Sequence, residues 1–281
     1  MVLVLCVNYL NDRDAVGFAR ELLAREAPDG FRLILVDNSE RPTLRQSLAE
    51  ACVAGRNLTT LTVGKNLGYF GGAAWALEHY MKTNALPEWV VVCNSDLRFL
   101  TRNFLTCLED FSRSHDYAVV APSILSRLSR GDQNPFMAVR PSNLRMRFNK
   151  MVFSAYPVSV VYSLLSHLRT TCRAALRAAA PEPPVEVGST AAPMPIYAGH
   201  GACLAFRRTY FEAGGTLYHG AFLFCEEIFV AETLRRLGLS LAYDPRLKVV
   251  HEEHKTTGYW PTRLMMSYMK QASAYCADTF F

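Results

Sequence analysis

The sequence contains no apolar run long enough to cross a membrane, because a spanning helix needs about 20 consecutive apolar residues. Residues 1–7 are apolar but lack a basic lead and pass directly into Asn8, so we expect no signal peptide. The eight cysteines are scattered and include no C-x-x-C pair, which argues against a disulfide framework and against structural zinc. We therefore expect a cytoplasmic protein with reduced thiols.

Two glycine-rich phosphate-binding loops are also missing. No G-x-G-x-x-G follows the first apolar run, which argues against a dinucleotide-dependent oxidoreductase. No G-x-x-x-x-G-K-[ST] occurs, which argues against a P-loop NTPase.

Acidic residues are rare in one segment. Residues 123–180 contain nine Lys and Arg but one acid, Asp132, in a chain whose net charge is +5. The remainder of the chain is therefore slightly acidic. A basic segment on a nearly neutral body indicates a local anionic partner and argues against nucleic-acid binding.

Short apolar runs alternate with helical patterns through the first 122 residues. The runs predicted as strands are 2–7, 31–36, 58–63, 89–93 and 117–121. Helices are predicted between them at 12–26, 42–54 and 73–81, and from Thr101 onward. This alternation predicts an α/β fold with a Rossmann-like, mostly parallel central sheet and helices on both faces.

The stretch from Trp89 to Asp96 combines a valine-rich buried strand with the polar turn Asn94-Ser95-Asp96. In an open α/β sheet, ligands bind at the carboxyl ends of the strands, where this turn places its carboxylate. A hard oxygen ligand at that edge suits Mg²⁺ or Mn²⁺ bridging phosphate oxygens.

The pattern changes between residues 123 and 195. Arg140, Arg145 and Lys150 precede an apolar stretch at 151–165, and more arginines follow before a loop rich in Pro and Ala. We predict a basic helical insertion. Contact with an anionic membrane surface or a lipid-linked substrate and a plain insertion with solvent-facing arginines are equally good interpretations.

The alternation resumes at Ile196. A helix is predicted from Glu226 to Gly238, where glycine ends it, and two strands at 239–243 and 247–250 lead to His251. Residues 259–281 carry apolar residues at helical spacing and predict a final helix. The chain thus divides at 1–122, 123–195, 196–258 and 259–281.

A set of short motifs occurs in a specific order. They are Val7-Asn8-Tyr9, Val36-Asp37-Asn38, Asn66-Leu67-Gly68 with Gly71-Gly72, Asn94-Ser95-Asp96, Gly201-Ala202-Cys203, Phe224-Cys225-Glu226-Glu227 and Val250-His251. With these motifs the chain resembles the family 2 glycosyltransferases of the GT-A fold, and among them the rhamnosyltransferase-like enzymes of bacterial surface polysaccharide synthesis. The resemblance covers residues 1–122 and 196–258.

The resemblance implies a nucleotide-sugar site in the first half of the chain and an acceptor and catalytic site in residues 196–258. The implied nucleotide-sugar contacts are Val7, Asn8, Tyr9, Asp37, Asn38, Asn66, Gly68, Gly72, Asn94 and Ser95. The implied contacts with the acceptor and donor sugar are Gly201, Ala202, Cys203 and Glu226. Residues 123–195 carry no family motif and are interpreted as an acceptor lid or a membrane-surface contact.

The resemblance also assigns the chemistry. Asp96 and His251 are the implied ligands of Mn²⁺ or Mg²⁺, and His254 is an alternative to His251. Glu227 is the implied catalytic base, although relatives more often carry Asp there and Asp in place of Asn94. With one base and no candidate nucleophile opposite it, a single displacement with inversion is expected. The expected partners are a UDP- or dTDP-sugar and a glycan or lipid-linked acceptor, with no nucleic acid.

Two other functions remain open at this point. The pair Glu226-Glu227 is also what a helix dipole favours at a helix N-terminus, so a non-catalytic sugar-nucleotide-binding or assembly subunit is an alternative. A nucleotidyltransferase is a weaker one, because the sequence lacks a glycine- and lysine-rich N-terminal loop.

Overall fold

The computed structural model describes residues 1–178, 191–253 and 262–281. His254 and the Pro-rich loop at 181–190 therefore lie outside the described residues. The strands are β1 (Val2–Asn8), β2 (Phe31–Asp37), β3 (Leu58–Thr62), β4 (Trp89–Asn94), β5 (Leu97–Phe99), β6 (Val119–Ser126), β7 (Met194–Ile196), β8 (Cys203–Arg207) and β9 (Leu241–His251). The helices are α1 (Asp12–Arg25), α2 (Leu44–Glu50), α3 (Tyr69–Met81), α4 (Phe104–Ser114), α5 (Asn143–Ser154), α6 (Tyr156–Ala178), α7 (Arg208–Glu212), α8 (Glu226–Leu237) and α9 (Arg263–Phe280).

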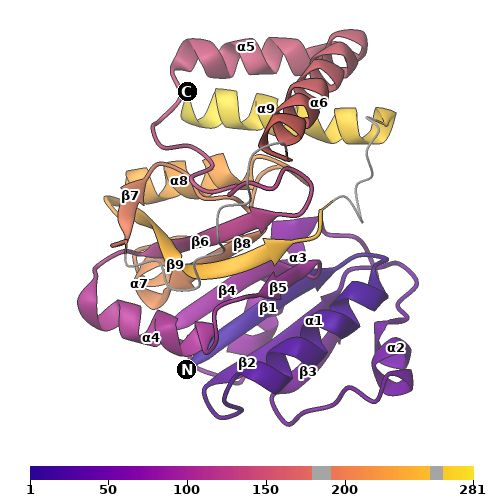
Figure 1. The fold of residues 1–281 in the computed structure, drawn as a ribbon, viewed down its shortest axis with the longest axis vertical. Helices are drawn as coiled ribbons and strands as arrows, with labels where there is room; N and C mark the ends of the chain where they lie inside the picture. The colour runs from indigo at the N-terminus through magenta and orange to yellow at the C-terminus, as the bar shows by residue number, and fades with distance from the viewer. Residues whose placement is uncertain (179–190, 254–261) are drawn as a thin grey trace.

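The described strands form one open sheet in the order β3-β2-β1-β4-β8-β6-β9-β5, with β7 also paired to β9 (Figure 1). The first four strands are parallel neighbours. Between β4 and β6, β8 runs antiparallel to both, and it joins the two halves of the chain into one sheet. The predicted α/β fold class is confirmed, and the antiparallel pairs belong to its second half.

The sheet is covered on both faces because its central strands are apolar at successive positions. In β1, Val2, Val4 and Cys6 belong to the core cluster that α1, α2 and α4 close. The alternate residues Leu3 and Leu5 belong to the cluster closed by α3, α7, α8 and α9. This alternation follows from the two-residue period of a strand.

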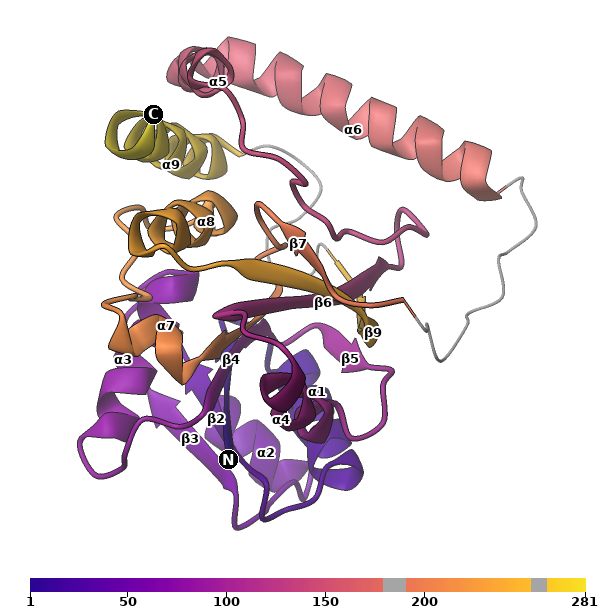
Figure 2. The ribbon, with the colours of Figure 1, turned by 90° about the vertical axis from the view of Figure 1, so that its left-hand side faces the viewer.

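Residues 143–178 and the C-terminal helix form a separate layer over α8. Figures 1 and 2 show α5 and α9 side by side, with α6 extending from them as a long arm. The predicted helical character of the insertion is confirmed. It consists of two helices because α5 ends at Ser154, and Pro157 stands in the first turn of α6, where its missing N–H is tolerated.

Three strand predictions differ from the structure. The strand at 117–121 continues to Ser126 as β6, so the insertion begins later. The two strands at 239–243 and 247–250 are one strand, β9, whose register against β6 shifts between Pro122 and Ser123. The short strands β5 and β7 were not predicted, since three residues each are too few to show a period.

Candidate active site

A cavity of about 420 Å³ lies where the ends of β1, β4 and β9 meet the start of β8 and of α8. Asp96 and Glu227, which come from opposite halves of the chain, both line it. The predicted site residues that line this cavity are Val7, Tyr9, Asn38, Asn66, Gly68, Asn94, Ser95, Asp96, Gly201, Ala202, Glu226, Glu227 and His251. The structure therefore brings together residues from every motif that the sequence singled out.

Asp96 and His251 are the nearest acid and imidazole in this cavity. Asp96 follows β4, and its neighbour Leu97 pairs directly with His251 in the β5–β9 ladder. The distance from His251 Nε2 to Asp96 Oδ1 is 3.4 Å, and both residues are 8% exposed. The carboxylate and the imidazole are therefore neighbours on one part of the cavity wall.

A hydrogen bond at Nδ1, on the side of the ring away from Asp96, fixes the orientation of His251. Its Nδ1 lies 2.9 Å from Gln133 Oε1. The Gln133 amide nitrogen donates to the carboxylate of Glu253, so the amide oxygen faces the ring and Nδ1–H must donate to it. In the neutral ring this leaves the lone pair of Nε2 on the Asp96 side, as a metal-binding histidine requires.

These groups fit a divalent cation that a phosphate-bearing substrate helps to hold. No cluster of three or more His, Cys, Asp or Glu side chains with metal-binding geometry occurs among the described residues. Mg²⁺ is typically held by one or two carboxylates together with substrate phosphates and water. The Asp96 carboxylate with the Nε2 of His251 matches such a partial ligand set.

The second acidic group of the cavity is the pair Glu226 and Glu227, the first two residues of helix α8. Gly201 N–H donates to Glu227 Oε1 at 3.1 Å, and the adjacent Phe224 N–H donates to Glu226 Oε1 at 3.0 Å. A Cβ on Gly201 would stand 3.0 Å from Glu227 Oε1, so glycine allows this close approach. Cys225, which precedes the helix, has a left-handed backbone with φ of 62° and turns the chain into the cavity.

Both carboxyl groups hold protons more tightly than usual. Burial, and then the charge of Glu227, raise the pKa of Glu226 to about 8. Burial also raises the pKa of Glu227, whereas its hydrogen bond from Gly201 acts in the opposite direction. At neutral pH Glu226 is therefore protonated beside Glu227.

The glycine-rich segment is held against the opposite wall by two asparagines. Asn38 donates to Asn66 Oδ1 at 3.1 Å and to the Gly68 carbonyl at 2.9 Å, and it accepts from Leu67 N–H. Gly68 has φ of +75°, and a Cβ there would lie 1.9 Å from the Phe222 carbonyl oxygen. The next residue, Tyr69, donates to the Gly201 carbonyl at 2.9 Å. The segment thus joins both halves of the site.

Four predicted site residues do not line the cavity. Asp37 is buried and accepts from the backbone N–H groups of Ser39 and Leu44, each at 3.2 Å, at the start of α2. Asn8 donates to Asp12 Oδ1 at 2.8 Å, on α1. Gly72 and Cys203 stand behind the cavity wall, where Gly72 packs closely on Val7 and Asn38. Their ligand contacts remain predictions.

Six lining residues were not among the predicted site residues. Tyr69 and Phe224 lie within motifs, Leu223 and His200 stand next to motifs, and Gln133 and Glu253 come from segments without a family motif. His200 is half-buried beside the His251 ring, with centroids 5.8 Å apart, and its Nδ1 accepts from Ala202 N–H. Burial, and then the neighbouring His251, lower the pKa of His200 to about 4, so its ring is neutral. Only its position next to Gly201 could have indicated it.

The chain resembles known glycosyltransferases in sequence and in fold. No protein-family model matches it. The N-acetylglucosaminyl-diphospho-decaprenol L-rhamnosyltransferase of Mycobacterium tuberculosis is 23% identical over 262 residues, which are 91% of this chain and 77% of that protein. The structure of GalNAc-T7 with UDP, GalNAc and Mn²⁺ superposes with a TM-score of 0.55 and 12% identity over 90% of this chain and 43% of that one.

A second solved structure is similar as well. The mannosyltransferase PcManGT from Pyrobaculum calidifontis, in complex with GDP-Man and Mn²⁺, gives a TM-score of 0.50 and 16% identity over 92% of this chain and 58% of that one. This chain therefore spans less than two thirds of either solved structure.

The solved structures show the fold of this chain, which is that of the GT-A glycosyltransferases. In sequence the chain is similar to a rhamnosyltransferase, so the resemblance to the rhamnosyltransferase-like enzymes of family 2, predicted from its motifs, is confirmed as a resemblance.

Proposed function

We propose that this protein is a metal-dependent, inverting glycosyltransferase of surface polysaccharide synthesis. It moves a sugar from a nucleoside-diphosphate donor, UDP or dTDP, to a hydroxyl group of a glycan or lipid-linked acceptor. The observation that carries this proposal is that the Asp96–His251 pair and the Glu226–Glu227 pair line one cavity. The M. tuberculosis relative, named for transfer of rhamnose to a lipid-linked sugar, supports the donor and acceptor classes.

Asp96 and His251 would hold Mn²⁺ or Mg²⁺ beside the donor diphosphate. When bound, the cation supplies positive charge that stabilises the departing nucleoside diphosphate. Two structures of similar fold were solved with Mn²⁺, which supports a divalent cation in this class of site. The protein contributes the orientation of His251 through Gln133.

Glu227 acts as the general base. Its carboxylate takes the proton from the acceptor hydroxyl while that oxygen bonds to the anomeric carbon and the bond from this carbon to the diphosphate oxygen breaks. Gly201 N–H holds one oxygen of the carboxylate in place. Glu226 is turned to the Phe224 backbone and is protonated at neutral pH, so it does not serve as a nucleophile. One displacement therefore inverts the anomeric configuration.

A thermal-shift panel tests this function. The protein is titrated with UDP-, dTDP-, GDP- and CMP-sugars in Mn²⁺ and again in EDTA, since a ligand that binds only the folded state raises its melting temperature. We expect a shift with UDP- or dTDP-sugars that EDTA removes and that Asp96→Ala abolishes. Glu227→Gln should keep the shift and lose about 10²–10⁴-fold in turnover. No shift with any donor, or undiminished transfer by Glu227→Gln, would contradict the proposal.

We also propose that the α5–α6 layer rests on an anionic membrane surface at the inner face of the cell membrane. Among the described residues, no helix has the length and apolar character to span a bilayer. The outward-facing apolar side chains are Leu144, Phe148 and Met151 on α5 and Val158, Val161, Leu165 and Leu168 on α6. Arg145, Arg147 and Arg169 are exposed among them, and such a surface suits anionic lipid. All eight cysteines are free thiols, which supports a reducing compartment.

Vesicle sedimentation tests this contact. We expect the protein to sediment with phosphatidylglycerol vesicles at low salt and to remain in solution with phosphatidylcholine vesicles. The double variant Arg145→Glu/Arg147→Glu should lose sedimentation. The control Arg56→Glu/Arg113→Glu makes the same change of charge at exposed positions elsewhere and should keep it. Equal behaviour of the two variants would contradict this contact.

A further inference from the structure

A second cavity, of about 330 Å³, adjoins the first on the far side of the acidic pair. Phe224, Glu226 and Glu227 line both cavities. A ligand in the second cavity would therefore lie next to the base while remaining outside the donor and metal side of the site. The active site has two compartments that meet at Glu227.

The walls of the second cavity are mostly apolar. They come from the inner face of α5, from α9, from the start of α8 and from the segment before α5. The apolar side chains are Phe136, Met137, Met146, Phe153, Ile228 and Met269. Methionines and phenylalanines at these positions form an adaptable hydrocarbon surface.

The charge of these walls argues against a phosphate in this compartment. No Lys or Arg occurs among the described residues that line it, and its other polar side chains are Asn149 and Ser273. A diphosphate brought here would face Glu227 with no compensating cation, and an unpaired buried charge is costly. A neutral, apolar group matches the walls.

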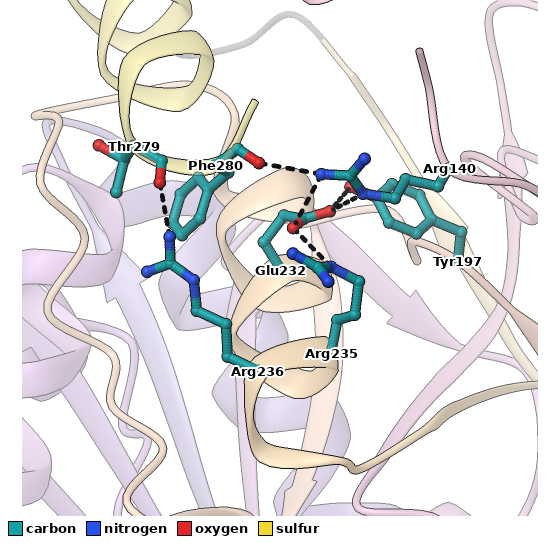
Figure 3. A network of polar contacts seen from close by, with 7 residues as sticks. All are labelled: Arg140, Tyr197, Glu232, Arg235, Arg236, Thr279 and Phe280. Atoms are coloured by element: carbon teal, nitrogen blue, oxygen red, sulfur yellow. Dashed lines mark hydrogen bonds and ion pairs between the residues drawn. The ribbon is translucent and has the colours of Figure 1, made fainter. Parts of the chain in front are cut away.

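An ion-pair network around the buried Glu232 carboxylate connects three of these walls (Figure 3). Glu232, on α8 and fully buried, accepts from Arg140 at 2.6 Å, from Arg235 at 2.9 Å and from the Tyr197 hydroxyl at 2.8 Å. Arg140 also donates to the Phe280 carbonyl of α9 at 2.9 Å. The segment before α5, α8 and α9 are thus tied together, so the second cavity is preformed.

Helix α5 separates this cavity from the exposed apolar face. Met146 and Phe153 point inward and are buried, whereas Leu144, Phe148 and Met151 of the same helix are exposed. The spacing of these two sets places them on opposite sides of one helix. An apolar chain that enters the cavity from the α5–α6 side would therefore contact first the exposed apolar face of these helices and then the apolar walls of the cavity.

We propose that the second cavity binds an apolar chain of the acceptor, joined to its sugar without an intervening phosphate, with the reacting hydroxyl at Glu227. This inference rests on the proposed transferase function, because it names the acceptor class for the same base. The volume is about ten times the roughly 30 Å³ share of one water molecule, which accommodates about ten carbon-sized groups and not a whole lipid. The chain chemistry is shared by isoprenyl and fatty-acyl carriers.

Photolabelling tests the proposal. Two diazirine-bearing glucosides, one with a ten-carbon isoprenyl chain and one with a ten-carbon straight chain, are crosslinked to the protein, and the labelled peptides are mapped by mass spectrometry. We expect labels on the inner face of α5 and on α9 near Met269. The probe with the more efficient label identifies the carrier type, and methyl glucoside should not compete with either probe.

Two filling variants and one matched control sharpen the result. Asn149→Trp and, separately, Met269→Trp place an indole in the cavity from half-buried positions and should reduce labelling at least tenfold. Leu144→Trp makes the same addition on the outer face of α5 and should leave labelling unchanged. The donor-induced thermal shift in Mn²⁺ reports folding and donor binding in each variant.

The outcomes separate the two proposals. Labelling confined to the outer α5–α6 face, or undiminished in both filling variants while they keep the donor shift, would overturn the cavity assignment. If no donor raises the melting temperature of the unmodified protein while the cavity is still labelled, the transferase proposal is overturned and the apolar site remains.

Discussion

His251 Nε2 lies 3.4 Å from Asp96 Oδ1 because the residue after Asp96 pairs with His251 in the β5–β9 ladder. The backbone pairing of two strands thus places the carboxylate and the imidazole of the proposed cation site. Glu252 N–H also donates to the Asp96 carbonyl at 3.0 Å, which continues the ladder past its last pair. The spacing of the two proposed ligands is therefore a property of the sheet and not of a loop.

Gln133→Leu should weaken Mn²⁺ binding without unfolding the protein. The leucine removes the acceptor of His251 Nδ1–H and releases the ring, and loss of such a supporting group typically costs 10–100-fold in metal affinity. Calorimetric titration with Mn²⁺ in the presence of a nucleoside diphosphate measures the effect. Gln46→Leu, on the exposed face of α2, is the control and should bind as the unmodified protein does. Equal affinities would show that Gln133 does not position the ring.

Glu226→Gln should become progressively more stable than the unmodified protein as the pH rises. The pKa of Glu226 is raised from 4.5 to about 8, so the folded state holds a proton that the unfolded state releases above pH 4.5. Stability from this group is full below pH 4.5 and is lost as the pH rises towards 8, on the order of a few kcal/mol in total.

Urea unfolding at pH 5, 6.5 and 8 in EDTA measures this pH dependence. The difference between Glu226→Gln and the unmodified protein should grow across the three values. Glu40→Gln, at an exposed position, should give a flat difference. A flat difference for Glu226→Gln as well would mean that the carboxyl is not protonated in the folded protein.

Gly68→Ala should cost more stability than Gly64→Ala, although both residues have nearly the same backbone angle. Their φ values are +75° and +77°, a region that L residues rarely adopt, so each alanine carries backbone strain on the order of 1–3 kcal/mol. Only at Gly68 would the new Cβ meet a backbone atom, the Phe222 carbonyl oxygen at 1.9 Å, while Gly64 has nothing within 4 Å. Because Gly68 lines the cavity proposed to bind the donor, Gly68→Ala should also reduce donor affinity, and Gly64→Ala should not. If the two variants lost equal stability and equal donor affinity, the close contact between Gly68 and the Phe222 carbonyl oxygen would be contradicted.

Arg140→Leu should destabilise the protein by about 3 kcal/mol, because it removes a principal partner of the fully buried Glu232 carboxylate. The pKa of Glu232 is lowered, against its burial, by hydrogen bonds from Arg140, Arg235 and Tyr197, so the carboxylate stays charged in the folded protein. Arg113→Leu breaks an exposed pair with Asp110 and should cost less than about 1 kcal/mol. If the two variants lose similar amounts of unfolding free energy in urea, Arg140 does not help to hold the walls of the second cavity together.

Much of the first half of the fold followed from local patterns. The valine-rich run at Trp89–Val92 and the polar turn after it required no distant partner to predict, because a buried parallel strand is apolar at successive positions. The same holds for Gly68, whose left-handed backbone is a property of its own turn. Glu227 was different, since helix-dipole preference and catalysis both favour an acid there, and only the motif order selected it.

A residue that reaches the site from a distant part of the chain was not predicted. Gln133 reaches His251 and Glu253 because β6 runs beside β9, and no local period signals a pairing between segments so distant in the chain. The backbone contacts of Asp37 were not foreseen either, because its two oxygens accept from the N–H groups of Ser39 and Leu44, while its predicted ligand contact stays a prediction.

The order of residues along the chain therefore specified which strands form, where their polar ends fall and which side chains carry the chemistry. The folded arrangement alone decided that Asp96 would meet His251, that Gly201 would hold Glu227, and that an apolar compartment would open beside the base. The physical reason is that strand and helix periods are local, whereas cavities form where elements from distant parts of the chain pack against one another.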